Sequence, residues 1–123
     1  MKRVIVVAAL FGSAAANAQS DWVPMTKTAD HQTVEVDNLS VEREGDYVTF
    51  WDRITNPRTG EVSISHVRIY CATNEFAIGS SIRRNRLGRT ISSTNGPDQY
   101  YSMEVIFPES VIAGEKSVLC SKK

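Results

Sequence analysis

Apolar residues recur at every second position in several short segments of this chain, and turn residues separate these segments. In the clearest one, 47–54 (YVTFWDRI), Val48, Phe50 and Ile54 share one face, and the opposite face carries aromatic and polar side chains. Weaker segments of the same kind predict strands over 21–25, 32–36, 39–43, 75–82 and 89–93. The pattern is typical of an antiparallel sheet with one buried face.

The segment 61–71 follows a Pro- and Gly-containing turn at 56–60 and is the expected hairpin partner of 47–54. Its apolar phase changes side between Ile64 and Val67. A β-bulge near Ser65-His66 would bring both halves onto one face, so the pattern predicts a bulge there.

The C-terminal part predicts an extended segment over 100–107 and then a helix. Ser110 is a suitable N-cap, and apolar residues recur at helical spacing over 111–119. The predicted fold class is α+β and mostly antiparallel β, with a short C-terminal helix.

The N-terminus has the features of a secretory signal peptide. Lys2 and Arg3 precede an apolar run over 4–11, which is much shorter than the ~20 residues of a membrane-spanning helix. Small residues at Ala16 and Ala18 predict cleavage between Ala18 and Gln19, which leaves one domain over 19–123. The alternative is an amphipathic or buried N-terminal helix. We expect a periplasmic or secreted protein without a membrane span, and no cysteine stands at the cleavage point to carry a lipid anchor.

The charge balance excludes partners that depend on bulk electrostatics. The sequence holds 14 basic and 14 acidic residues, and loss of Lys2 and Arg3 leaves a net charge of −2. Such a weak charge argues against nucleic acid and against an anionic membrane surface as partners.

The only two cysteines, Cys71 and Cys120, both lie in the predicted mature chain. In an oxidising compartment they are most simply one disulfide, and closing a loop of this length stabilises a fold by about 4 kcal/mol. A metal pair and a catalytic thiol are the alternatives, but the sequence has no CxxC motif or histidine cluster to support them.

No catalytic motif is recognisable in the sequence. It lacks GxSxG, HExxH, a Walker loop and GxGxxG, and its only histidines, His31 and His66, are far apart. We expect neither an enzyme nor a cofactor or metal site, although a triad assembled from distant residues would leave no trace in the sequence.

The feature that interrupts the neutral composition is a cluster of arginines, Arg83, Arg84, Arg86 and Arg89, at the connection between two predicted strands. Guanidinium groups suit carboxylate, sulfate and phosphate groups through paired hydrogen bonds. The cluster is a candidate site for a protein or an acidic polysaccharide. The alternative is a solvated loop whose arginines pair with surface acids such as Glu42, Glu44 and Asp46.

The order of motifs along the mature chain resembles the surface-adhesin protein E-like family of bacterial envelope proteins. The residues that carry the resemblance are Trp22, 34–40 (VEVDNLS), 47–51 (YVTFW), Cys71, 107–110 (FPES) and 118–120 (VLC). The resemblance implies a sheet of about six strands, with a C-terminal helix on its concave face that a disulfide between Cys71 and Cys120 would tie to the sheet.

The resemblance also implies binding of host matrix proteins, and a homodimer by analogy. Two departures weaken that implication: the family's adhesin is lipid-anchored, and the aromatic residue that precedes the Pro-x-Ser step has only Tyr101 as a nearby counterpart. Two functions therefore stay open. One is an adhesin-like binding module, and the other is a periplasmic structural or accessory protein, such as an inhibitor or a subunit of an envelope complex.

Overall fold

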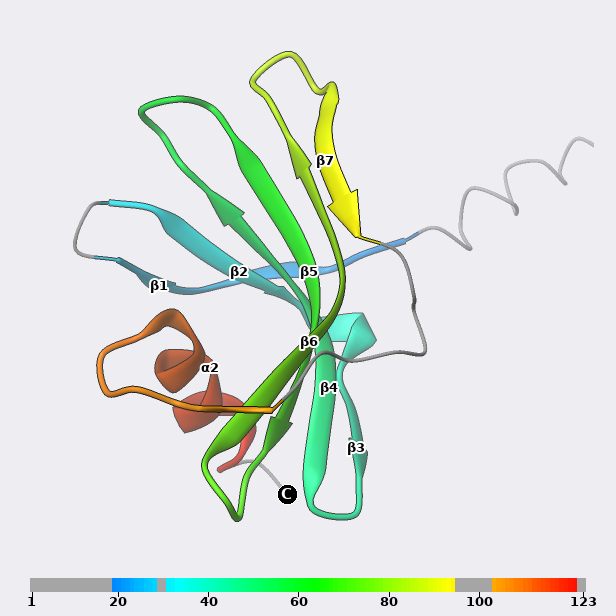
Figure 1. The fold of residues 1–123 in the computed structure, drawn as a ribbon, viewed down its shortest axis with the longest axis vertical. Helices are drawn as coiled ribbons and strands as arrows, with labels where there is room; N and C mark the ends of the chain where they lie inside the picture. The colour runs from blue at the N-terminus through cyan, green and yellow to red at the C-terminus, as the bar shows by residue number, and fades with distance from the viewer. Residues whose placement is uncertain (1–18, 29–30, 95–102, 122–123) are drawn as a thin grey trace, which may run out of the picture.

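The computed structural model describes residues 19–28, 31–94 and 103–121. The expected signal peptide, with Ala18 of its cleavage site, lies outside the described residues. The described chain forms one antiparallel sheet with a helix packed on one face (Figure 1). Six strands follow one another in the order β1-β2-β4-β5-β6-β7, while the short strands β3 and β8 pair with β4 and β6. The predicted fold class is confirmed.

The central hairpin consists of β4 (Tyr47–Thr55) and β5 (Val62–Tyr70). The two strands pair without interruption from Tyr47 opposite Tyr70 to Thr55 opposite Val62. An irregularity near Ser65-His66 is present as expected, but it does not bring both halves of β5 onto one face, because β5 keeps one alternation throughout its pairing with β4. The irregularity lies at the same height but in the pairing of β5 with β6, between Ser65 and Val67. Val62 and Ile64 therefore stay on the face opposite Val67.

The N-terminal part adds β1 (Trp22–Lys27) and β2 (Thr33–Asp37), which pair with a register shift between Pro24 and Thr26. A strand over 39–43 was expected, but Asn38–Ser40 is a 3-10 turn and the strand that follows it is β3 (Glu42–Glu44). The Asp37 side chain explains this turn, because its Oδ1 accepts hydrogen bonds from the backbone N–H groups of Asp21 and Leu39.

On the other side of the central hairpin, β6 (Glu75–Arg84) pairs with β7 (Thr90–Thr94) along one half and with β8 (Glu104–Val105) near its start. The expected extended segment is therefore represented by two paired residues, and its first part, 100–102, lies outside the described residues. The turns that join β4 to β5 and β6 to β7 lie at one end of the sheet, and the turn from β3 to β4 lies at the other end (Figure 1).

The helix α2 (Val111–Leu119) begins where the sequence predicted. The Ser110 hydroxyl accepts a hydrogen bond from the Ala113 backbone N–H at 3.1 Å, which caps the first turn. At the other end, Cys120 is bonded to Cys71 with a Cα–Cα distance of 5.8 Å, so the predicted disulfide is confirmed. A helix of this length is marginal alone, and the covalent tie keeps it on the sheet.

The core lies between α2 and the sheet face that carries Phe50. Its buried members come from β2, β4, β5, the segment after β8 and the helix: Val36, Val48, Phe50, Val67, Ile69, Ile106 and Leu119. The opposite face of the sheet is therefore the one on which long polar and aromatic side chains meet solvent.

Candidate functional site

The arginine cluster occupies the hairpin that joins β6 to β7. Asn85 shapes its tip, because its Oδ1 accepts hydrogen bonds from the backbone N–H groups of Leu87 and Arg89 at 2.9 and 3.0 Å. Gly88 completes the tip with a φ of 83°, a conformation that glycine adopts without strain. These local bonds hold the reversal in one shape, so the flanking arginines have defined positions.

Strand alternation separates the clustered arginines. Arg83 pairs with Ser63 and Arg84 with Val62, so the two guanidinium groups leave the sheet on opposite faces. The Nε atom of Arg83 lies 3.7 Å from a carboxylate oxygen of Glu61. Arg89 is exposed at the tip. The structure therefore divides the predicted site instead of presenting four equivalent cations.

Arg84 and Arg86 line one hollow of about 340 Å³ together with Arg53 from β4. Val62 and Ile64 contribute apolar wall, and Glu35 from β2 adds one carboxylate. Arg53 was not named as a site residue from the sequence. Its place opposite the Phe50 face was readable from strand alternation, but its nearness to Arg84 depends on the order and register of β4, β5 and β6.

Arg53 is held in place from two sides. Its Nε donates a hydrogen bond to Glu35 at 2.9 Å, and its guanidinium lies 4.4 Å from the centre of the Trp22 ring. A bidentate or stacked guanidinium loses less freedom on binding than a free one. Among the described residues, Arg84 and Arg86 have no carboxylate within ion-pair distance. Their charges are thus available to an anion.

The two hairpin tips touch beside this hollow. A Cβ atom built on Gly60, in the turn between β4 and β5, would lie 2.6 Å from the Cβ of Arg86. Gly60 also has a φ of 74°. Glycine at this position therefore allows the approach that forms one wall of the hollow.

Pairing of the arginines with Glu42, Glu44 and Asp46 does not occur in the structure. These acids lie at and beside the turn between β3 and β4, at the opposite end of the sheet (Figure 1). Glu44 instead accepts a hydrogen bond from the Tyr47 hydroxyl at 2.6 Å. Of the four clustered arginines, only Arg83 has a carboxylate partner among the described residues.

A second group of polar residues was missed from the sequence and lies inside the protein. Asp52 of β4 and Glu115 of α2 are 2 % and 0 % exposed, and their carboxyl groups contact each other across the helix–sheet interface. Neither oxygen of Glu115 receives a hydrogen from another described group. Two adjacent buried carboxylates would repel strongly, so one proton must be shared.

Burial raises the pKa of Glu115, and the negative charge of Asp52 raises it further. Burial also raises the pKa of Asp52, although a hydrogen bond from Glu115 and one from the Ser65 backbone oppose the rise. The pair is closed to solvent and cannot reach a ligand. The pair is part of the interface between α2 and the sheet.

His66 lies in β5 on the face opposite the core, stacked on Trp51 with ring centres 4.8 Å apart. Burial lowers its pKa, and the charge of Arg68 lowers it further. Within 19–28, 31–94 and 103–121, no three histidine, cysteine or acidic side chains gather closely enough to hold a metal ion. In the same part of the chain, no helix has the length and apolar composition to cross a membrane.

Comparison with protein-family models, with curated proteins and with solved structures finds no match. The resemblance to the surface-adhesin protein E-like family therefore stays a prediction.

Proposed function

We propose that this chain is an exported, non-enzymatic binding protein of the bacterial envelope that recognises acidic ligands through the arginine hollow. The observation that carries the proposal is the meeting of Arg84, Arg86 and Arg53 around one hollow of about 340 Å³, where Glu35 is the only carboxylate among the described residues of its wall. Ligands of matching chemistry are host matrix proteins with acidic segments and acidic polysaccharides.

The net charge of the chain and the geometry of the hollow support specific binding of acidic groups rather than non-specific electrostatic attraction. The chain as a whole has no net charge to draw polyanions, so binding must depend on local guanidinium groups. Arg53 is oriented by Glu35 and Trp22, and Arg86 is positioned by the contact between the two hairpin tips. Charge-assisted hydrogen bonds from oriented guanidinium groups to carboxylate or sulfate are stronger than neutral ones.

The test compares two double variants with the same change in charge. R84Q/R86Q removes two cations from the hollow, and R58Q/R89Q removes two exposed cations from the neighbouring hairpin tips, outside its wall. Binding to heparin and to polyglutamate is measured by calorimetry at several salt concentrations. We expect R84Q/R86Q to lose about tenfold or more in affinity and most of its salt dependence, while R58Q/R89Q stays close to wild type.

Stability provides the control for this comparison. Both pairs are exposed, so each double variant should unfold within about 1 kcal/mol of wild type. Equal losses of binding in the two variants would mean that net charge alone attracts polyanions, and the hollow would not be a site. Full binding by R84Q/R86Q would also reject the proposal.

The location of the protein decides whether such binding is adhesion. Antibody labelling of intact cells, beside a periplasmic control, should detect the protein if the arginine hollow meets host ligands. Detection only after disruption of the outer membrane would rule out adhesion and favour a periplasmic accessory role.

A further inference from the structure

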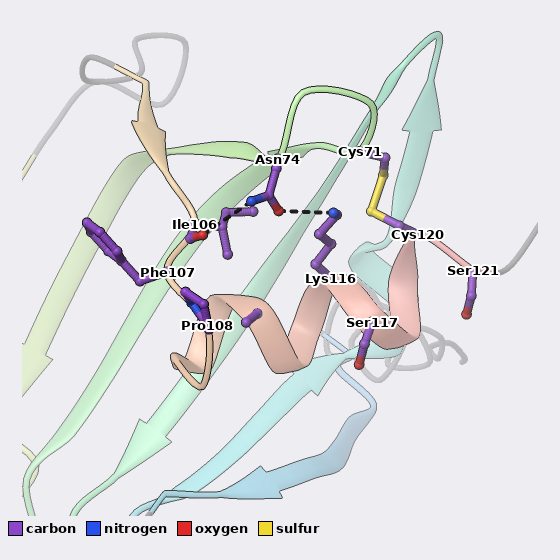
Figure 2. A pocket seen from close by; sticks show the side chains of 10 residues that line it. Cys71, Asn74, Ile106, Phe107, Pro108, Lys116, Ser117, Cys120 and Ser121 are labelled. Atoms are coloured by element: carbon purple, nitrogen blue, oxygen red, sulfur yellow. Dashed lines mark hydrogen bonds between the residues drawn. A yellow bond between two sulfur atoms is a disulfide. The ribbon is translucent and has the colours of Figure 1, made fainter.

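A groove of about 620 Å³ runs beside the disulfide, between α2, the turn from β5 to β6 and the segment 106–108 (Figure 2). Ile106, Pro108, Ala113 and the bonded pair of Cys71 and Cys120 form its apolar walls. A volume of this size is in the range of small-molecule sites. The groove lies at the opposite end of the sheet from the arginine hollow.

The two serine hydroxyls that line the groove use their only donor hydrogen on the protein itself. The Ser117 hydroxyl donates to the Gly114 carbonyl at 2.8 Å, and the Ser121 hydroxyl donates to the Val118 carbonyl at 3.0 Å. Asn74 donates to the Ile106 carbonyl at 3.3 Å. A bound peptide would bury several backbone carbonyls that need donors, and of these three side chains only Asn74 keeps one hydrogen to offer.

Lys116 differs from these side chains because it carries a positive charge. Its ammonium donates to the Asn74 side-chain oxygen at 3.0 Å, which directs it along the groove (Figure 2). An ammonium carries three donor hydrogens, so two are left for a ligand. Within the part of the chain that the structure describes, no acidic residue lines the groove and no carboxylate lies within ion-pair distance of Lys116. The groove therefore combines apolar walls with one positive charge.

The apolar surface continues beyond the groove. Phe107 at its rim is 70 % exposed, and Val105, two residues earlier on the same extended segment, is 57 % exposed. Exposed apolar side chains that adjoin a groove mark an interaction site more often than isolated ones do. A ligand with a long apolar body could cover both the groove and its rim.

We propose that this groove binds a free, single-chain fatty acid, with its carboxylate on Lys116 and its acyl chain against Ile106, Pro108 and Ala113. A fatty acid has one anionic group and a long apolar chain without further polar atoms. The anion complements the Lys116 ammonium, and the chain complements the apolar walls of the groove. A neutral lipid would leave the charge of Lys116 unused, and a peptide would find too few donors for its backbone carbonyls.

The experiment uses the oxidised protein and dodecanoate below its micellar concentration. Calorimetry gives affinity and stoichiometry, and the methyl resonance of Ala113 reports the place of binding. We expect one dodecanoate per chain and a shift at Ala113. K116Q should weaken dodecanoate binding about tenfold or more, because it removes a hydrogen bond to a charged group. K27Q, with the same charge change on β1, should bind as wild type does.

Further ligands separate the alternatives. Dodecanol should bind wild type and K116Q equally, and K116E should bind dodecyltrimethylammonium better than dodecanoate. Equal dodecanoate affinities for wild type and K116Q would overturn the proposal, as would a shift at distant methyl groups without one at Ala113. Stronger binding of a short apolar peptide than of dodecanoate would identify a peptide groove instead.

Discussion

Replacing Glu115 by glutamine should make the protein more stable at neutral and alkaline pH. In the wild type, Glu115 is buried against Asp52, and both burial and the neighbouring charge hold its pKa above the ordinary value of 4.5. The folded protein keeps this proton at pH 7, whereas the unfolded chain releases it. Folding therefore takes up a proton, and stability falls as pH rises above about 4.5.

The magnitude follows from the distance between the working pH and the ordinary pKa. Holding a carboxyl protonated costs about 1.4 kcal/mol for each pH unit above its unfolded pKa, or about 3.5 kcal/mol at pH 7. A glutamine has no such proton to retain, and its amide can donate a hydrogen bond to Asp52. The advantage of E115Q over wild type should therefore grow by about 1.4 kcal/mol per pH unit between pH 5 and 8.

The assay is denaturant unfolding at pH 5, 6, 7 and 8, followed by tryptophan fluorescence with the disulfide intact. E104Q, which changes an exposed glutamate on β8, is the matched control. Its unfolding free energy should change with pH as that of wild type does. Parallel profiles for E115Q and wild type would refute the reasoning, because they would mean that Glu115 carries no extra proton in the folded protein.

Three further predictions concern the rest of the fold. Burial lowers the pKa of His66, so its protonation should destabilise the fold as pH falls through about 6.5. The H66F variant should therefore lose less stability than wild type between pH 7 and 5. An NMR titration of the wild type should place the pKa of His66 below 6.5. Replacing both cysteines by alanine should cost about 2–5 kcal/mol, and unfolding of the wild type with and without reductant should reproduce that difference. G60A should destabilise the protein more than G45A does, because both glycines have positive φ but only at Gly60 does an added Cβ collide with Arg86. G45A should cost about 1–2 kcal/mol of folding stability. Calorimetric melting of both variants measures the difference.

Much of the secondary structure was predictable because its signals are local. Alternation over 47–54, the turn at 56–60 and the Ser110 cap each depend on residues close in sequence, and all three appear where expected. The expectation for β5 was wrong for an instructive reason. Val62 and Ile64 looked like core residues, but they line the arginine hollow on the opposite face.

The candidate site was only partly visible in the sequence. The run of arginines was plain, but strand alternation sends Arg83 and Arg84 to opposite faces, and Arg53 joins the hollow from about 30 positions earlier. The buried acids left weak signals. Asp52 falls on the Phe50 face by alternation, and Glu115 falls between Ile112 and Leu119 at helical spacing. Neither pattern predicts that Asp52 and Glu115 contact each other.

The sequence by itself determined the strands, the capped helix and the pairing of two cysteines, because periodicity, turn chemistry and the cysteine count act within or along single segments. The tertiary structure alone decided that Arg53 meets Arg84 and Arg86, that Asp52 meets Glu115, and that Lys116 lies in the groove beside the disulfide. These contacts depend on sheet order, register and helix placement. Those are set by the packing of the whole chain at once, and no segment carries them on its own.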